Sequence, residues 1–287
     1  MRYQSRSFLF GSIALLLFSG LGVLASGFSF DQTHVSITAL DVGQGDAILL
    51  KFPHSQEVLI DGGPDGSVHA KLGKHLPFLD RSIDMVVLTH PDGDHITGLI
   101  DVIKNYRVDR ILTPPVFRDT QAYHAFHEIA TKRHIPIIAA SPGQIFEFAS
   151  GVQLQILASG DQDDLDAGLP LNDSSIVARM IYHDFDALLT GDASSVIEQE
   201  LISAYPDLSV DVLKVGHHGS RFSTSKAFLE STKPSIALIS VGRDNTYGHP
   251  HRETLHRLEE AGVRILRTDQ YGDVTVRTDG KTFDTFY

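Results

Sequence analysis

The segment Thr89-His90-Pro91-Asp92-Gly93-Asp94-His95 places two imidazoles and two carboxylates within six residues. It follows the apolar run 85–88, so these side chains are expected just after a β-strand. Side chains at alternate positions of an extended segment point the same way, so His90 and Asp92 are expected to reach one metal ion. Asp94 and His95, one step further round the turn, are expected to reach a second. Carboxylates and imidazoles suit Zn, Mn or Fe, and the spacing therefore predicts a metal-dependent hydrolase.

More polar clusters occur further along the chain, each beside an apolar run that is expected to form a strand. They lie at 172–175, 190–192, 216–220 and 242–251. Because strand ends meet at a common rim of a sheet, these clusters are expected to approach the first one. An alternative is that the first cluster only caps the helix expected at 96–106. The downstream clusters disfavour that alternative.

Together these segments resemble the metallo-β-lactamase fold superfamily, and within it the metallo-hydrolase domain of ComEC-type DNA-uptake competence proteins. The segments that carry the resemblance occur in the family's order: Leu40-Asp41-Val42-Gly43-Gln44-Gly45-Asp46-Ala47, Leu59-Ile60-Asp61-Gly62-Gly63, 88–95, 172–175, 189–192, 214–220 and 247–251. The resemblance covers residues 35–287 and implies a single hydrolase domain of the α/β (α+β) class, a four-layer αββα sandwich. The metal centre is then expected on the rim of the sandwich.

The resemblance also implies a role for each residue of the first cluster. His90 and Asp92 are expected to bind one ion, Asp94 and His95 the other, and Asp192 to bridge them. Asp94 is in addition a candidate catalytic residue. In most of the superfamily a histidine stands where this chain has Asp92.

Further site residues implied by the resemblance lie in the second half of the chain. Asp173, nineteen residues before Asp192, is the candidate for one more metal ligand. The last ligand is expected to be His217, with His218 as the alternative because sequence does not fix a register of one residue. His249 is expected to protonate the leaving group or contact phosphate, and its alternative is a histidine that only shapes a turn. The candidate substrate-binding residues are Ser174, Ser220, Arg243 and Tyr247.

The expected ligand set is rich in carboxylates. Asp92, Asp94, Asp173 and Asp192 would supply four negative charges, which equal the four positive charges of two divalent ions. That balance should lower the electrophilicity of the metals and shift the preference from Zn toward Mn or Mg. We therefore expect two divalent metal ions, Zn or Mn, as cofactors.

The expected function is hydrolysis of a phosphoester or phosphodiester bond, with a hydroxide that bridges the two metals as the nucleophile. One alternative is hydrolysis of a lactam, lactone or thioester on the same scaffold. The other is a non-catalytic, metal-binding envelope protein that assists DNA uptake. Many chemistries share this fold and metal centre, so neither fixes the substrate.

Composition agrees with one catalytic domain and argues against a general nucleic-acid binder. The 287 residues are 42% hydrophobic and include no cysteine, which permits a substantial core and excludes disulfides. The formal net charge is −12, whereas general binding of nucleic acid depends on Lys and Arg. A phosphoester or nucleic-acid substrate would be held locally by basic residues near the motifs, which are otherwise ordinary surface charges: Lys214, Arg221, Lys226 and Arg243.

Apolar patterning predicts two β-rich blocks with helices on the outside. The first block has strands at 35–42, 47–52, 58–60, 85–88 and 110–112, followed by a helix at 120–132. The second has strands at 152–158, 176–181, 187–189, 210–215, 236–241 and 274–277, and helices at 196–204, 226–230 and 252–261. The polar stretch 159–171 is expected to be a loop near the mouth of the site.

The N-terminus has the pattern of a signal peptide. Arg2 and Arg6 precede an uncharged run at 7–30, and small residues before 26 suit cleavage after Ala25. Residues 1–25 are therefore expected to direct export to the periplasm or beyond. Removing them takes away two arginines and no acidic residue, so the formal charge goes from −12 to −14. The alternative is an uncleaved membrane anchor, because a bilayer span needs about 20 apolar residues.

Cell fractionation checks the export prediction. The product is expected outside the cytoplasm, with an N-terminus near Ser26 when it is sequenced. A full-length membrane-bound species would favour the anchor, and a full-length species confined to the cytosol would contradict export.

Overall fold

The computed structural model describes residues 33–77 and 80–287. The chain divides into two units, Met1–Thr33 and His34–Tyr287, and the second is the folded domain described below. The predicted signal peptide or anchor at 1–25 lies outside the described residues. Within the described ranges, no helix is both long enough and apolar enough to span a membrane.

The first sheet has eight strands in the order β17-β16-β1-β2-β3-β5-β7-β8, counted over the described residues. Strands β17 to β3 pair antiparallel, and β3 to β8 pair parallel. The bounds are β1 Val35–Ala39, β2 Ile48–Phe52, β3 Gln56–Ile60, β5 Met85–Val87, β7 Ile111–Thr113, β8 Ile137–Ala139, β16 Val274–Thr278 and β17 Phe283–Phe286.

The second sheet has seven strands in the order β15-β14-β13-β12-β11-β10-β9, over the same described part of the chain. Strands β9 to β12 pair antiparallel, and β12 to β15 pair parallel. The bounds are β9 Ile145–Glu147, β10 Gln153–Ala158, β11 Val177–Tyr182, β12 Phe185–Leu189, β13 Val212–Lys214, β14 Ile236–Ile239 and β15 Arg264–Arg267. A small parallel pair, β4 Ser82–Ile83 and β6 Arg107–Val108, forms a separate two-stranded sheet.

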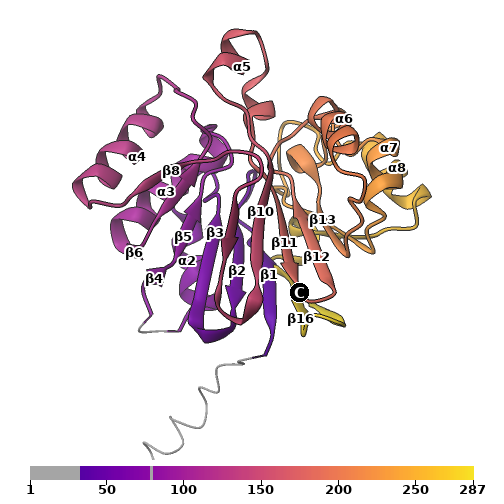
Figure 1. Cartoon of the computed structure of the whole chain (residues 1–287), viewed down its shortest axis with the longest axis horizontal. Coiled ribbons are helices and arrows are strands. Elements are labelled where there is room, and N and C mark those ends of the chain that lie inside the picture. The colour runs from indigo at the N-terminus through magenta and orange to yellow at the C-terminus, as the bar shows by residue number, and fades with distance from the viewer. Residues whose placement is uncertain (1–32, 78–79) are drawn as a thin grey trace, which may run out of the picture. The chain divides into compact units, whose positions relative to one another are not determined.

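Helices cover the outer face of each sheet, as Figure 1 shows. Helices α2 Ser67–His75, α3 Gly93–Asn105 and α4 Gln121–Lys132 lie on the first sheet. Helices α6 Ser195–Ala204, α7 Lys226–Thr232 and α8 Arg252–Glu260 lie on the second. Shorter elements are α5 Gln162–Asp166, α9 Thr268–Tyr271 and the 3₁₀ turns η1 Pro53–Ser55, η2 Ala149–Gly151, η3 Leu171–Ser174 and η4 Gly216–Gly219.

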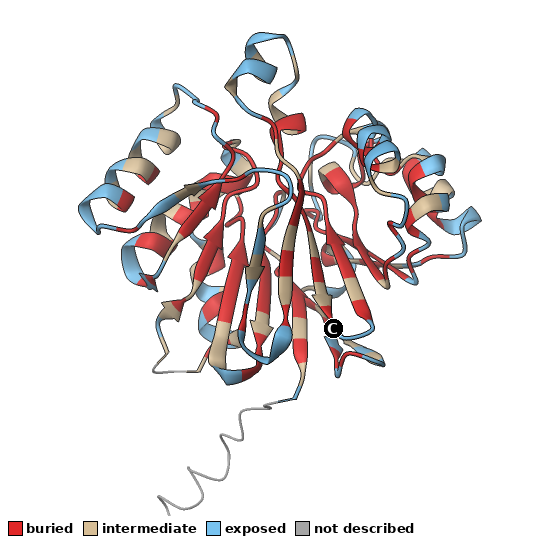
Figure 2. Ribbon diagram, in the orientation of Figure 1, coloured by how far each residue is buried: buried red, intermediate tan, exposed pale blue. Residues whose placement is uncertain are grey.

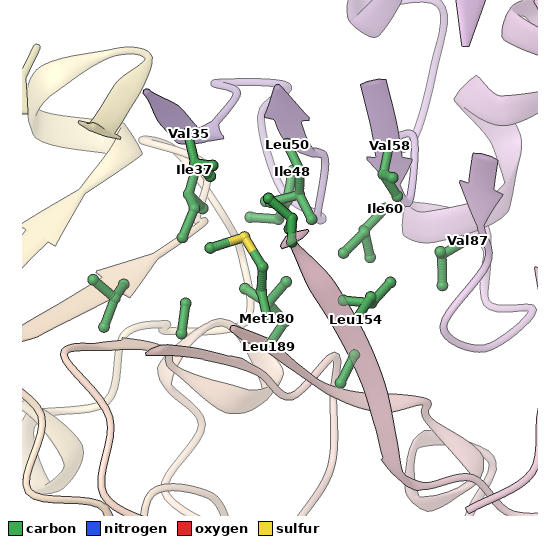
Figure 3. Packing of buried hydrophobic residues seen from close by; sticks show 14 of the residues in the cluster. Val35, Ile37, Ile48, Leu50, Val58, Ile60, Val87, Leu154, Met180 and Leu189 are labelled. Atoms are coloured by element: carbon green, nitrogen blue, oxygen red, sulfur yellow. The ribbon is translucent and has the colours of Figure 1, made fainter. Parts of the chain in front are cut away.

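The period of two along each strand gives the sheets two apolar faces. In β2, Ile48 and Leu50 belong to the core between the sheets, while Leu49 belongs to the core beneath the helices. Figure 3 shows Leu154 and Met180 of the second sheet pointing toward the side chains of the first. Burial is accordingly concentrated in the strands, and exposure in the helices' outer faces (Figure 2). The predicted four-layer αββα sandwich is confirmed.

One predicted strand belongs to the other sheet. Residues 274–277 are assigned by sequence order to the second block, but β16 pairs antiparallel with β1 of the first sheet, Val35 opposite Thr278. The C-terminal hairpin thus returns to cover the backbone groups of β1, which would otherwise form an open edge. Sequence patterning also misses the strands β8, β9, β15 and β17 and helix α2, and the loop expected at 159–171 contains the short helix α5.

Candidate metal centre

Loops that follow strands of both sheets build the candidate centre. In the first sheet, β5 leads through the turn that carries His90 and Asp92 into helix α3. In the second sheet, β12 is followed by Asp192, and its parallel neighbour β13 is followed by η4, which carries His218. The carboxyl ends of parallel strands are the usual position for ligands in such sheets.

Four side chains converge in what we call the Asp94 group: Asp94, His95, Asp192 and His218. Nε2 of His218 lies 3.3 Å from Oδ2 of Asp94 and 3.5 Å from Oδ2 of Asp192. Nε2 of His95 lies 3.5 Å from the same oxygen of Asp192 and 3.9 Å from Oδ1 of Asp94. Donor atoms at these separations surround a space suited to one cation.

A second set, the His90 group, consists of His90 and Asp92. Nε2 of His90 lies 3.8 Å from Oδ2 of Asp92. Donor atoms of His90, His95 and Asp192 all lie within 4.8 Å of one another. Asp192 therefore stands between the two groups, in the position expected of a bridging carboxylate.

The groups fit metal ions because their inward-facing atoms lack partners. Nε2 of His90, His95 and His218 and Oδ1 of Asp192 are buried and accept or donate no hydrogen bond among the described residues. Leaving such polar atoms buried and unpaired costs free energy, which coordination of a cation would remove. The four atoms come from three different segments of the chain, and divalent metal ions would give all of them a common partner.

Hydrogen bonds on the far side of each imidazole turn Nε2 toward the centre. Nδ1 of His95 donates to Asp61 at 2.8 Å, and Nδ1 of His218 donates to the carbonyl of Ser240 at 3.0 Å. The Thr89 hydroxyl also donates to Asp61, at 2.7 Å, and its oxygen lies 3.2 Å from Nδ1 of His90. Such outer contacts fix the tautomer in which Nε2 carries the free lone pair.

The electrostatics of the centre favour positive charge. Burial lowers the pKa of His90 to about 3, so its imidazole is neutral, which is the form that binds a metal. Burial also opposes protonation of His218, but the carboxylates of Asp192 and Asp46 outweigh it and raise its pKa to about 10. Burial would raise the pKa of Asp192, yet His218 and His95 lower it well below its usual value. The surrounding carboxylates thus create a site that attracts cations.

His218, the alternative ligand in the sequence, is the histidine that joins the Asp94 group. Both His217 and His218 adopt left-handed backbone angles, with φ of 48° and 53°, which turn the two side chains apart. The His217 side chain is 32% exposed, and its Nε2 lies 3.9 Å from Asp192. Its ring lies 5.3 Å from that of His249, and its nitrogens contact the Asn172 amide. His217 therefore lies on the outer rim of the centre.

Asp173 is not brought to the centre. Its two carboxylate oxygens accept hydrogen bonds from the backbone N–H of Ser194 at 2.8 Å and from the Ser194 hydroxyl at 3.0 Å. Ser194 is the N-cap of α6, so Asp173 anchors the start of that helix. It belongs to none of the donor groups formed by the described residues.

The candidate substrate residues divide into structural and outward-facing ones. The Ser174 hydroxyl donates to the carbonyl of Leu171 at 2.7 Å, and the Ser220 hydroxyl accepts from Phe222 N–H at 3.3 Å. Nε of Arg243 donates to the carbonyl of Asp269 at 3.2 Å. Tyr247 is 70% exposed and stacks on His249 with ring centroids 6.0 Å apart. Tyr247 and His249 are thus the predicted residues that line the open side near His217.

Two buried acidic residues at the centre, Asp61 and Asp46, have no role in the sequence-based assignment. Asp61 orients His95, while Asp46 pairs with Lys214 at 2.8 Å. Lys214 had been a candidate for holding phosphate, but it is 1% exposed and unavailable to a substrate. Asp61 follows the apolar run 58–60 and Asp46 precedes the apolar run 47–50, which is the available sequence signal for their burial.

Comparison with known proteins gives the family of the chain. A family model described as the metallo-beta-lactamase superfamily matches residues 40–243. The chain belongs to this superfamily. ComE operon protein 3 of Bacillus subtilis (strain 168) is 32% identical over 258 residues, which cover 84% of this chain and 33% of that protein. Competence protein ComA of Neisseria gonorrhoeae is 29% identical over 278 residues, which cover 91% of this chain and 36% of that protein.

This metallo-β-lactamase domain therefore spans about a third of the length of those relatives, and the predicted resemblance to competence proteins is confirmed. Among solved structures, the diiron β-hydroxylase CmlA of Streptomyces venezuelae matches with a TM-score of 0.56 and 14% identity, covering 85% of this chain and 54% of that one. At that identity the match shows the fold alone.

Metal analysis of two variants tests which histidine is a ligand. His218→Ala is expected to lose most of one ion per chain, because it removes a donor of the Asp94 group. His217→Ala is expected to keep both ions, because its ring lies at the rim. Metal content of the purified variants is measured by elemental analysis. A His217→Ala protein that loses an ion beside a His218→Ala protein that retains both would reverse the assignment.

Proposed function

We propose that this metallo-β-lactamase domain is a dinuclear metal-dependent hydrolase that cleaves phosphoester bonds, with phosphodiesters as the preferred class. The observation that carries the proposal is the set of buried, unpartnered donor atoms of His90, His95, Asp192 and His218. Two divalent ions, when bound there, polarise phosphoryl oxygens and lower the pKa of water. The His90 group and Asp192 would hold one ion, and the Asp94 group the other.

Two features support phosphoester over lactam chemistry. The carboxylates Asp92, Asp94 and Asp192 are hard oxygen donors, which suit Mn and similar ions that bind phosphate oxygens. The relative from Neisseria is named a competence protein. The motifs of this chain also resemble those of DNA-uptake competence proteins, and DNA is a phosphodiester polymer. We propose Zn or Mn as the ions and export as the location, with the N-terminal segment as the membrane contact if it is not cleaved.

The open side of the centre offers substrate contacts from the second half of the chain. His249 has a buried Nδ1 without a hydrogen-bond partner among the described residues. Burial, with the neighbouring His217 and His218, lowers the pKa of His249 to about 4. The ring is therefore neutral at physiological pH and suited to hydrogen bonding with a phosphate oxygen, which is one of its two expected roles. Asn245 fixes the His249 backbone through hydrogen bonds of 2.7 and 3.0 Å.

An activity screen tests the proposed reaction. Purified protein loaded with Mn or Zn is assayed against bis-p-nitrophenyl phosphate, single-stranded DNA, a phosphocholine ester and nitrocefin. The phosphodiesters are expected to be hydrolysed, and Asp192→Ala should abolish both the activity and most of the bound metal. Asp186→Asn, near the start of β12 and so at the opposite end of that strand from Asp192, serves as the control and should retain both. Hydrolysis of nitrocefin alone would favour the lactam alternative, and inactivity with two ions bound would favour the accessory role.

The role of His249 is tested with substrates that differ in their leaving groups. His249→Ala is expected to keep both ions, because its ring belongs to neither donor group. Loss of a hydrogen bond to a charged oxygen, worth about 2 kcal/mol, should lower kcat/KM roughly 30-fold for good and poor leaving groups alike. A defect that disappears with good leaving groups would instead identify His249 as the proton donor.

A further inference from the structure

A buried ion pair next to the metal centre takes no part in the proposed reaction. Oδ2 of Asp46 lies 2.8 Å from Nζ of Lys214, and the two side chains are 2% and 1% exposed. Asp46 lies in the loop between β1 and β2 of the first sheet, and Lys214 is the last residue of β13 in the second. The pair therefore crosses from one sheet to the other directly beneath the donor groups.

Asp46 contacts metal-ligand candidates from both halves of the chain. Its Oδ1 lies 3.3 Å from Nδ1 of His218, on the side of the ring away from the centre. Its backbone N–H donates to the carbonyl of Asp94 at 3.3 Å, and its own carbonyl accepts from Gly63 N–H at 2.8 Å. One residue thus touches two members of the Asp94 group, which lie more than a hundred positions apart in the sequence.

The preceding glycine makes this contact possible. A Cβ on Gly45 would lie 2.2 Å from the carbonyl oxygen of Asp94, and the glycine has a φ of 134°. A side chain there would push the loop away from helix α3. The close packing of Gly45 therefore fixes the distance between Asp46 and Asp94.

Lys214 allows the carboxylate to remain there. A buried carboxylate without a cation is strongly destabilising, and Asp46 lies close to the carboxylates of Asp61 and Asp192. The ammonium of Lys214 also donates to the carbonyl of Val215 at 2.7 Å. The backbone carbonyl of Lys214 accepts a hydrogen bond from the Thr190 hydroxyl at 2.7 Å. Lys214 is thereby tied to the two loops that carry Asp192 and His218.

We propose that Asp46 and Lys214 form a positioning pair for the ion of the Asp94 group. Asp46 holds the carbonyl of Asp94 through its backbone N–H and places its carboxylate 3.3 Å from the outer nitrogen of His218, and Lys214 holds Asp46 in place from the opposite sheet. The pair therefore determines how closely the ligands from the two halves of the chain approach that ion. The inference rests on the proposed two-metal centre and is independent of the substrate.

Metal-binding titrations of three variants test the positioning role. In Asp46→Asn and Lys214→Met, one charge of the pair is left buried alone. Binding of the ion of the Asp94 group, called the second ion from here on, should weaken about 10–100-fold, as it does when other partners of metal ligands are removed. The double variant Asp46→Asn with Lys214→Met has no unpaired charge, so its thermal stability should recover. Its affinity for the second ion should stay at least about tenfold below wild type, because the link between the sheets is still absent.

The binding constants of both ions are measured by competition with a chromophoric chelator, on full-length protein. The matched control removes another ion pair, Arg179 with Asp186 on the neighbouring strands β11 and β12, by Arg179→Met with Asp186→Asn. The control should bind both ions as wild type does. A double Asp46 and Lys214 variant that binds the second ion like wild type would overturn the inference. A wild-type protein that binds no second ion would instead contradict the proposed function.

Discussion

The structure depends on the convergence of three buried imidazole nitrogens on one buried carboxylate. Nε2 of His90, His95 and His218 are buried near the carboxylate of Asp192 and have no hydrogen-bond partner among the described residues, an arrangement that suits bound cations. No single strand or helix can supply this set, because its members lie on loops of both sheets. The sandwich is the frame that brings these loops together, and its three apolar cores hold the strands that end at the centre.

Backbone contacts complete this convergence. A Cβ on Gly98 of α3 would lie 1.9 Å from the carbonyl oxygen of Gly62, so the helix that starts with the metal motif packs directly on the loop that carries Asp61. The backbone N–H of Ile176 donates to the carbonyl of Thr89 at 2.9 Å, which joins the second half of the chain to the same loop. Because the backbones approach so closely at Gly98, only glycine fits there, and the loops that carry the metal-ligand candidates can meet.

The sequence was sufficient for most of the fold and part of the site. Long apolar periodicities predicted the central strands and the helices near α4, α6 and α8, whereas short exposed strands such as β8 and β9 lack such a pattern. His90, Asp94, His95 and Asp192 each follow an expected strand end, and this position was sufficient to predict that they meet at one site. The choice between His217 and His218 depends on two consecutive left-handed backbone conformations, which the hydrophobic pattern of the sequence does not predict. Asp173 shows a similar limit, because only the folded structure brings it against Ser194, the N-cap of α6.

The position of Asp173 changes the charge balance of the proposed centre. With Asp92, Asp94 and Asp192 as the carboxylate ligands, two divalent ions keep one net positive charge toward the substrate, where the sequence had suggested neutrality. Asp46 would add one more negative charge, but Lys214 neutralises it at 2.8 Å. The ion pair therefore allows a carboxylate to position the ligands without weakening the attraction of the metals for a phosphate.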